Sequence, residues 1–129
     1  MEFLKAENGK MTLGGRPILL RIAALGGWLL PEGYMWKLYT KCDRPRRMEA
    51  LISSLCGEEY AASFWRRYYD SYITERDMEY IASQGFNSVR LRLPARHLLR
   101  PEGLNEDYAR HMDECIAWCK KHGLLVILD

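Results

Sequence analysis

The sequence contains no apolar run that approaches the roughly 20 consecutive residues a membrane-spanning helix requires. Residues 1–10 are largely polar and charged where a secretory signal peptide would carry its apolar core. The sequence taken as it stands therefore predicts a cytoplasmic protein without a membrane partner. If an upstream signal precedes this N-terminus, the same sequence fits a secreted protein.

The CxxC motif typical of zinc and redox sites is also absent. Cys115 and Cys119 lie four residues apart, and Cys42 and Cys56 lie far from them in the sequence, so no CxxC pair occurs. This spacing gives little support to a zinc site or a disulfide framework. We expect buried free thiols, because cysteine is among the residues most often found inside proteins, and we expect neither a metal nor a cofactor.

Neither sign of charge predominates, since the formal net charge is only +2 on 129 residues. This balance does not by itself indicate a nucleic-acid partner. The densest basic run covers residues 41–47 and is interpreted as a solvated approach to a helix, with phosphate binding as the alternative. A hydrophobic content of 48% and a charged content of 28% are ordinary for one globular domain, or part of one.

Turn residues and strand-like runs predict an antiparallel hairpin within residues 1–20. Its strands would cover residues 2–6 and 10–13, with a turn at Asn8-Gly9. The apolar run over residues 18–25 then predicts a strand, and we take its second half as the first long parallel strand.

The rest of the chain alternates helices and strands. Residues 28–43 lack periodicity and predict a loop, as do residues 94–104. Helices are expected over residues 46–55, 58–69, 74–84 and from Asn105 to Gly123. Thr74 and Asp77 form a variant of the capping box. Residues 86–93 and 124–128 predict strands, the last one fully buried and tipped by Asp129.

Strands alternating with helices indicate βαβ units with a parallel sheet. A small open sheet that binds a dinucleotide is disfavoured, because Gly26-Gly27-Trp28 lacks the GxGxxG spacing. Three parallel strands do not close a barrel, which takes eight strands and about 250 residues. The residues by themselves therefore predict an α/β fold with parallel strands, either part of a (β/α)8 barrel or a small open sheet.

Three segments, in the right order, resemble glycoside hydrolase family 5, the broad cellulase and exo-glucanase family. They are LGGWLLPEGY (residues 25–34), ITERD (73–77) leading through GFNSVRL (85–91), and Trp118 followed by HGLLVILD (122–129). The resemblance spans most of this sequence but only about the N-terminal third of the family's domain. It implies that residues 1–129 are the N-terminal portion of a (β/α)8 TIM barrel, an incomplete catalytic domain in which residues 1–20 form the hairpin and residues 21–129 the first three β/α elements. It also implies a hydrolase that cleaves O-glycosidic bonds in a β-glucan-like polysaccharide or oligosaccharide.

Retaining enzymes of this kind use two carboxyl groups about 5 Å apart. The resemblance places these two glutamates at the ends of the fourth and seventh strands, so neither is expected among these residues. The isolated chain is accordingly predicted to be inactive. A carboxylate at a barrel strand's carboxyl end suggests catalysis for Asp129, whereas the resemblance assigns the equivalent aspartate a supporting role.

The resemblance carries over a supporting residue, Arg90, which would hold the nucleophile ionised and oriented; a strand-end ion pair is the alternative. Glu32 matches a glutamate that hydrogen-bonds a sugar hydroxyl, although it could be an exposed loop carboxylate. Tyr34 and Trp36 are candidates for stacking on sugar rings. His97 could donate a hydrogen bond to substrate or be a solvated loop histidine.

Two departures and three structural assignments complete this pattern. Arg92 stands where the family usually has proline, and the proline comes later, at Pro94. Arg90 and Arg92 would then share one side of the strand, bringing two guanidiniums to one site. We expect Trp28 to pack the loop, and we assign no chemistry to His111 and His122.

Two other functions are compatible with this sequence. A non-catalytic carbohydrate-binding or interaction module would use Glu32, Trp28, Tyr34 and Trp36 as a surface. A small nucleic-acid-binding α/β domain would rely on clustered arginines instead. These are Arg44, Arg46, Arg47, Arg66 and Arg67.

Overall fold

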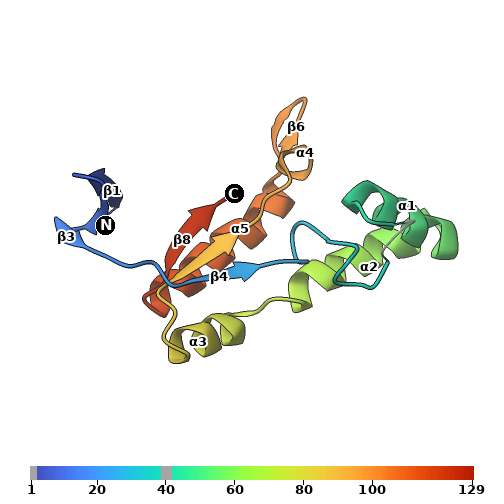
Figure 1. Cartoon of the computed structure of the whole chain (residues 1–129). Coiled ribbons are helices and arrows are strands. Elements are labelled where there is room, and N and C mark those ends of the chain that lie inside the picture. The colour runs from blue at the N-terminus through green and yellow to red at the C-terminus, as the bar shows by residue number, and fades with distance from the viewer. Residues whose placement is uncertain (1–2, 39–41) are drawn as a thin grey trace.

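A computed structural model describes residues 3–38 and 42–129 of the chain. Its centre is a three-stranded parallel sheet in the order β4 (Ile22–Leu25), β5 (Ser88–Leu91) and β8 (Leu125–Leu128). The three arrows point the same way in Figure 1, and the register aligns Leu25 with Leu91 and Leu91 with Leu128. The predicted parallel α/β arrangement is confirmed for these strands, which form an open sheet.

Helices α3 (Glu75–Ser83) and α5 (Glu106–Lys121) connect these strands. The capping box predicted for α3 is present: Thr74 donates its hydroxyl to Asp77 Oδ2 at 2.9 Å and its backbone N–H at 2.7 Å. Gly85 ends the helical segment with φ +81°, a conformation that glycine adopts without a side-chain clash.

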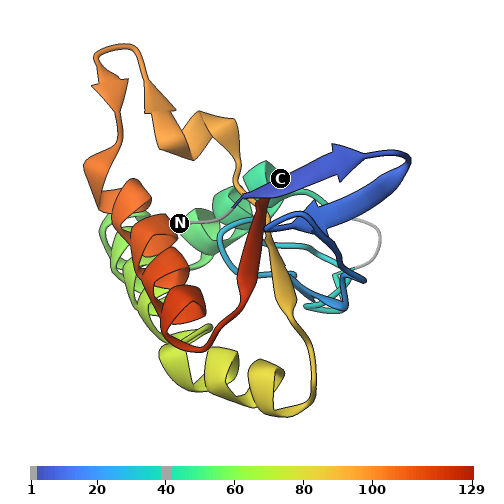
Figure 2. The same ribbon diagram turned by 90° about the vertical axis from the view of Figure 1, so that its left-hand side faces the viewer.

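The core lies between the sheet and α5, which runs along one side of the strands (Figure 2). Helix α5 contributes Tyr108, Cys115 and Cys119, all buried. Met78 of α3 and Val89 of β5 are fully buried against the same cluster. Apolar burial of this kind is the main source of stability, roughly 25 cal/mol per Å².

The N-terminal hairpin consists of β1 (Leu4–Glu7) and β2 (Lys10–Leu13), with the predicted turn at Asn8-Gly9. A second turn leads to the short strand β3 (Arg16–Pro17), which extends the antiparallel sheet beyond the prediction. Glu2, predicted in the first strand, lies outside the described residues.

An insertion between β4 and α3 forms a pair of helices, α1 (Pro45–Cys56) and α2 (Glu58–Ser71). Pro45 begins α1 at a position where its missing N–H costs nothing. Both helices were expected from the sequence, and Figure 1 shows them beyond the carboxyl end of β4. Helix α2 carries a set of aromatic side chains that packs against the loop after β4.

Three sequence expectations were wrong in part. Residues 94–104 were expected to form a loop but contain α4 (Ala95–Leu98), β6 (Leu99–Arg100) and β7 (Gly103–Leu104). Local pairing holds these short elements together: Leu99 pairs with Leu104 across β6 and β7, and Asn105 donates its side-chain N–H to His97 O at 2.8 Å.

The last strand was expected to be fully buried, but β8 is an edge of the described sheet and its residues are partly exposed. The cysteines are free, as expected, yet Cys56 is exposed at the end of α1 and Cys42 is only partly buried. None of the helices over residues 3–38 and 42–129 combines the length and apolar character that crossing a bilayer demands.

Candidate functional site

A chain of four charged side chains lies at the carboxyl ends of the parallel strands. Arg90 belongs to β5, Arg92 follows directly after it, and Asp129 follows β8. Glu32 comes from the loop after β4. Backbone hydrogen bonds extend the sheet to this point: the Asp129 N–H donates to Leu91 O at 2.9 Å, and the Leu93 N–H donates to Asp129 O at 2.8 Å.

The four side chains form consecutive ion pairs. Arg90 Nη2 lies 2.7 Å from Asp129 Oδ2, and Arg92 Nε lies 3.7 Å from the same oxygen. Arg92 Nη1 also pairs with Glu32 Oε1. The expectation that the two guanidiniums approach one site is confirmed, and the fold adds the two carboxylates that neutralise them.

Glu32 is the most enclosed member of this group, with 14% of its side chain exposed. Its Oε2 accepts a hydrogen bond from the Gly27 N–H at 3.0 Å. A Cβ atom on Gly26 would lie 2.7 Å from that oxygen, so the backbone must come close to the carboxylate. The Glu32 carboxylate is therefore largely buried and fixed by the Gly27 N–H and Arg92, and the alternative of an exposed loop residue is wrong.

The loop after β4 is a compact series of turns. The Met35 N–H donates to Glu32 O at 3.0 Å, and the Leu38 N–H donates to Gly33 O at 2.8 Å. Gly33 has no room for a side chain, because a Cβ there would lie 2.2 Å from the Cys42 carbonyl oxygen. The sequence pattern of residues 25–34 thus encodes a close backbone approach around Glu32.

Trp28 fastens this loop to the helices. It is fully buried, donates its indole N–H to Tyr69 O at 2.7 Å and stacks on Trp118 with ring centroids 6.4 Å apart. The hydroxyls of Tyr68 and Tyr108 donate to the Gly27 and Leu29 carbonyls. The expectation that Trp28 packs the loop is confirmed.

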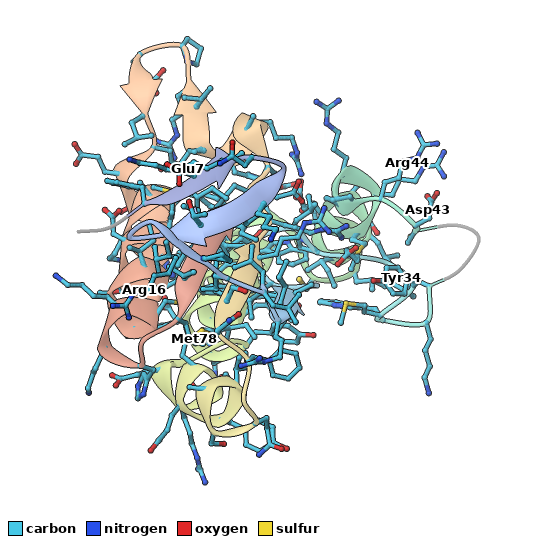
Figure 3. All side chains as sticks on the ribbon, turned by 60° about the vertical axis from the view of Figure 1, so that its left-hand side comes forward. Glu7, Arg16, Tyr34, Asp43, Arg44 and Met78 are labelled. Carbon is cyan, nitrogen blue, oxygen red and sulfur yellow. The ribbon has the colours of Figure 1, made fainter. Side chains whose placement is uncertain are left out.

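The two candidate stacking residues have different surroundings. Tyr34 is 60% exposed and lies on the same side of the molecule as Asp43 and Arg44 (Figure 3). Trp36 packs against Trp65 at 5.8 Å and Tyr68 at 5.3 Å between ring centroids. Burial raises the pKa of Tyr68 to about 12. Tyr34 offers an open ring, whereas Trp36 is part of an aromatic cluster.

His97 belongs to a separate group at α4. Its Nε2 lies 3.0 Å from Glu49 Oε1 in α1, and its ring stacks on Tyr108 at 5.4 Å. Arg96 pairs with the same Glu49 oxygen. Burial by itself would raise the pKa of Glu49, but the hydrogen bonds from His97 and Arg96 and their charges outweigh it and lower that pKa. The alternative of a solvated loop histidine is wrong.

Over residues 3–38 and 42–129, no hydrogen bond or ion pair joins the His97 group to the chain of charges at Arg90. His111, to which the sequence assigned no chemistry, is buried beside Trp28 and Tyr69. Burial, followed by the charge of Arg110, lowers the pKa of His111. It is therefore a core residue packed among aromatic rings.

The sequence missed two partners. Glu49 gave no local signal, because a single acidic residue on an amphipathic helix is ordinarily solvated. Arg92 was noted as a departure, but its pairing with Glu32 joins residues 60 positions apart. The part of the chain that the structure describes holds no group of three or more metal-ligating side chains.

This arrangement can bind hydroxyl groups. Carboxylates accept and guanidiniums donate hydrogen bonds, and an exposed aromatic ring offers a flat apolar face. The Glu32 and Asp129 carboxylates are both already paired with arginine, which suits an orienting role better than proton transfer. The four side chains Glu32, Arg90, Arg92 and Asp129 form a charged wall at the carboxyl edge of the parallel sheet. This edge is where α/β proteins bind their ligands.

Comparison with known proteins identifies the family of the chain. The model of the cellulase family, glycosyl hydrolase family 5, matches residues 52–129. The chain belongs to glycosyl hydrolase family 5, and the resemblance noted in the sequence is confirmed.

Individual relatives carry glycosidase names. A beta-xylosidase of Phanerodontia chrysosporium is 29% identical over 133 residues, which cover all of this chain and 27% of the relative. A probable glucan 1,3-beta-glucosidase A of Emericella nidulans is 32% identical, covering 81% of this chain and 27% of the relative. Endoglucanase C of Acetivibrio thermocellus is 36% identical over 69 residues, which cover 51% of this chain and 20% of the relative.

The crystal structure of AoRut has the same fold over this region. It superimposes with a TM-score of 0.65 at 24% identity, covering 85% of this chain and 32% of that one. The chain therefore spans roughly a third or less of the relatives it matches.

Proposed function

We propose that the chain supplies the N-terminal part of a (β/α)8 catalytic barrel in a retaining glycosidase that cleaves β-glucan-like polysaccharides or oligosaccharides. Family membership and the glycosidase names of the relatives support this function. The three parallel strands and their connecting helices have the order that such a barrel requires. Carbohydrate is the proposed partner.

The observation that carries the proposal is the chain of charges from Glu32 through Arg92 and Asp129 to Arg90. It lies where barrel enzymes build their active sites. Arg90 would stand beside the nucleophilic carboxylate, keeping it ionised. Glu32 would accept a hydrogen bond from a sugar hydroxyl, and Tyr34 would stack on a sugar ring. Trp36 and His97 would then act by holding the surrounding loops in place.

The two glutamates that perform the chemistry are expected to come from residues beyond these 129. Reading the codons that follow Asp129 tests this: the proposal requires five further β/α elements, with a glutamate after the fourth and after the seventh strand. An aryl β-glucoside and a β-glucan should be hydrolysed by the protein from the complete reading frame. The purified 129-residue chain should hydrolyse neither, and turnover by it would contradict the proposal.

A non-catalytic carbohydrate-binding module is the second candidate, favoured by the exposed ring of Tyr34, which follows Glu32 by two residues on the same loop. Titration of the isolated chain with gluco-oligosaccharides, followed by tryptophan fluorescence, tests this function. Saturable quenching without hydrolysis by the complete protein would favour the module. Tyr34→Ala should abolish the quenching, because the stacking face would be lost.

A further inference from the structure

Arg92 occupies the centre of the charged wall, the group formed by Glu32, Arg90, Arg92 and Asp129. It follows Leu91, the fully buried last residue of β5, so its backbone is fixed by the sheet. Its side chain is 29% exposed and turns toward the loop after β4. Arg92, whose backbone is fixed by the sheet, thus pairs with Glu32, which belongs to the loop after β4.

Arg92 contacts both carboxylates of the wall. Nη1 pairs with Glu32 Oε1, and Nε lies 3.7 Å from Asp129 Oδ2. Planar guanidinium groups suit two directed contacts, because their N–H groups diverge in a fixed fork. Arg90, by contrast, pairs with Asp129 alone among the described residues.

Glu32 depends on this contact for its orientation. Over the described residues, the other hydrogen bond to its carboxylate comes from the Gly27 N–H. The turn that carries Glu32 continues into the exposed residues Tyr34 and Met35. One backbone N–H leaves the carboxylate free to rotate about that contact, whereas a second anchor on the opposite oxygen stops the rotation.

Arg92 also sets the charge of the wall. With it, two guanidiniums face two carboxylates and the four formal charges cancel. Without it, Glu32 and Asp129 would face Arg90 alone, with an excess negative charge. A neutral wall suits an uncharged saccharide and does not draw in a cation.

We propose that Arg92 is a positioning residue: by anchoring Glu32 Oε1 to the end of β5, it holds that carboxylate in the orientation that accepts a hydroxyl of an uncharged sugar. This inference rests on the proposed glycosidase function. It assigns Arg92 no contact with the reacting atoms. Its effect should therefore appear in substrate binding and depend on Glu32.

The test uses the glycosidase from the complete reading frame, with an uncharged aryl β-glucoside as substrate. Arg92→Gln should raise KM about tenfold, the loss of one charge-assisted hydrogen bond, with kcat changed less than about threefold. Arg92→Lys should recover part of the lost affinity, because it keeps the charge but not the fork. Glu32→Gln combined with Arg92→Gln should be no worse than Glu32→Gln alone.

Arg110→Gln is the matched control, since Arg110 also pairs with two carboxylates, those of Asp70 and Glu114, and contacts none of the four residues of the charged wall. Its KM should stay near that of the unaltered enzyme. An unchanged KM in Arg92→Gln, or additive effects with Glu32→Gln, would overturn the positioning role. If Arg92→Gln fails to fold by circular dichroism, Arg92→Met, which keeps the apolar stem, undergoes the same test.

Failure of the proposed function is recognised separately. An unaltered enzyme that hydrolyses no glycoside would end the glycosidase proposal before any variant is compared. Turnover in the unaltered enzyme together with an unaffected Arg92→Gln would refute only the role of Arg92.

Discussion

Arg90 Nη2 lies 2.7 Å from Asp129 Oδ2, joining the carboxyl ends of the neighbouring parallel strands β5 and β8. Both side chains are about two-fifths exposed. Solvent screens such an ion pair, so it contributes little to the free energy of unfolding. Its significance is geometric, because it fixes the direction in which each side chain leaves the sheet.

Asp129→Asn should therefore lower the free energy of unfolding by less than about 1 kcal/mol. Urea denaturation of the 129-residue chain, followed by circular dichroism, measures this change. Asp113→Asn, an exposed aspartate on α5, serves as the comparison. A loss of several kcal/mol would mean that the pair is a main support of the sheet.

Gly26→Ala should displace Glu32, because the added Cβ would lie 2.7 Å from Glu32 Oε2 and 3.1 Å from Met35 Sδ. We expect a loss of about 1–3 kcal/mol in the free energy of unfolding, as for other forced contacts. Adding Glu32→Asp, which shortens the side chain, should return part of that loss. Additive costs in the double variant would argue against a clash with Glu32.

Trp28→Ala should be the most damaging of these changes, with a loss of about 3–5 kcal/mol, because it empties a fully buried site. Trp28→Phe keeps an aromatic ring but leaves the Tyr69 carbonyl without its donor. That variant should lose about 1–3 kcal/mol. Thermal and urea unfolding measure both, and exposed Tyr34→Ala should change stability little.

The Glu49 group predicts a dependence of stability on acid. The folded-state pKa of Glu49 lies below its ordinary value of 4.5. The unfolded state therefore binds the proton more readily, and stability present above pH 4.5 falls as the pH drops through the folded-state pKa. Glu49→Gln should flatten this decline below pH 4.5, measured as urea unfolding from pH 7 to pH 3. An unaltered acid profile in Glu49→Gln would remove Glu49 as its cause.

Local patterns predicted the elements well. Asn8-Gly9 allows the tight turn of the hairpin, and Thr74 with Asp77 begins α3 through hydrogen bonds three residues apart. Asn105 and Gly123 were expected to bound the next helix, and α5 lies between them. Each signal acts within a few residues, so it is readable without the fold.

The elements over residues 95–104 could not be read in this way. The bond from Asn105 to His97 O and the ion pair from Arg96 to Glu49 hold this segment in place. Short elements carry too little local preference to form by themselves. The segment therefore depends on the pairing of β6 with β7, on Asn105 nearby, and on Glu49, which lies 47 residues from Arg96 in the sequence.

The sequence by itself determined the alternation of strands and helices, the family and the presence of two arginines on one side of β5, because period and spacing are local properties. Only the tertiary structure decided what those arginines contact. The parallel register brings Asp129 beside Arg90, and the turns after β4 bring Glu32 to Arg92. Ion pairs between distant residues depend on distances that folding alone sets, so the pairing of the charged wall belongs to the fold.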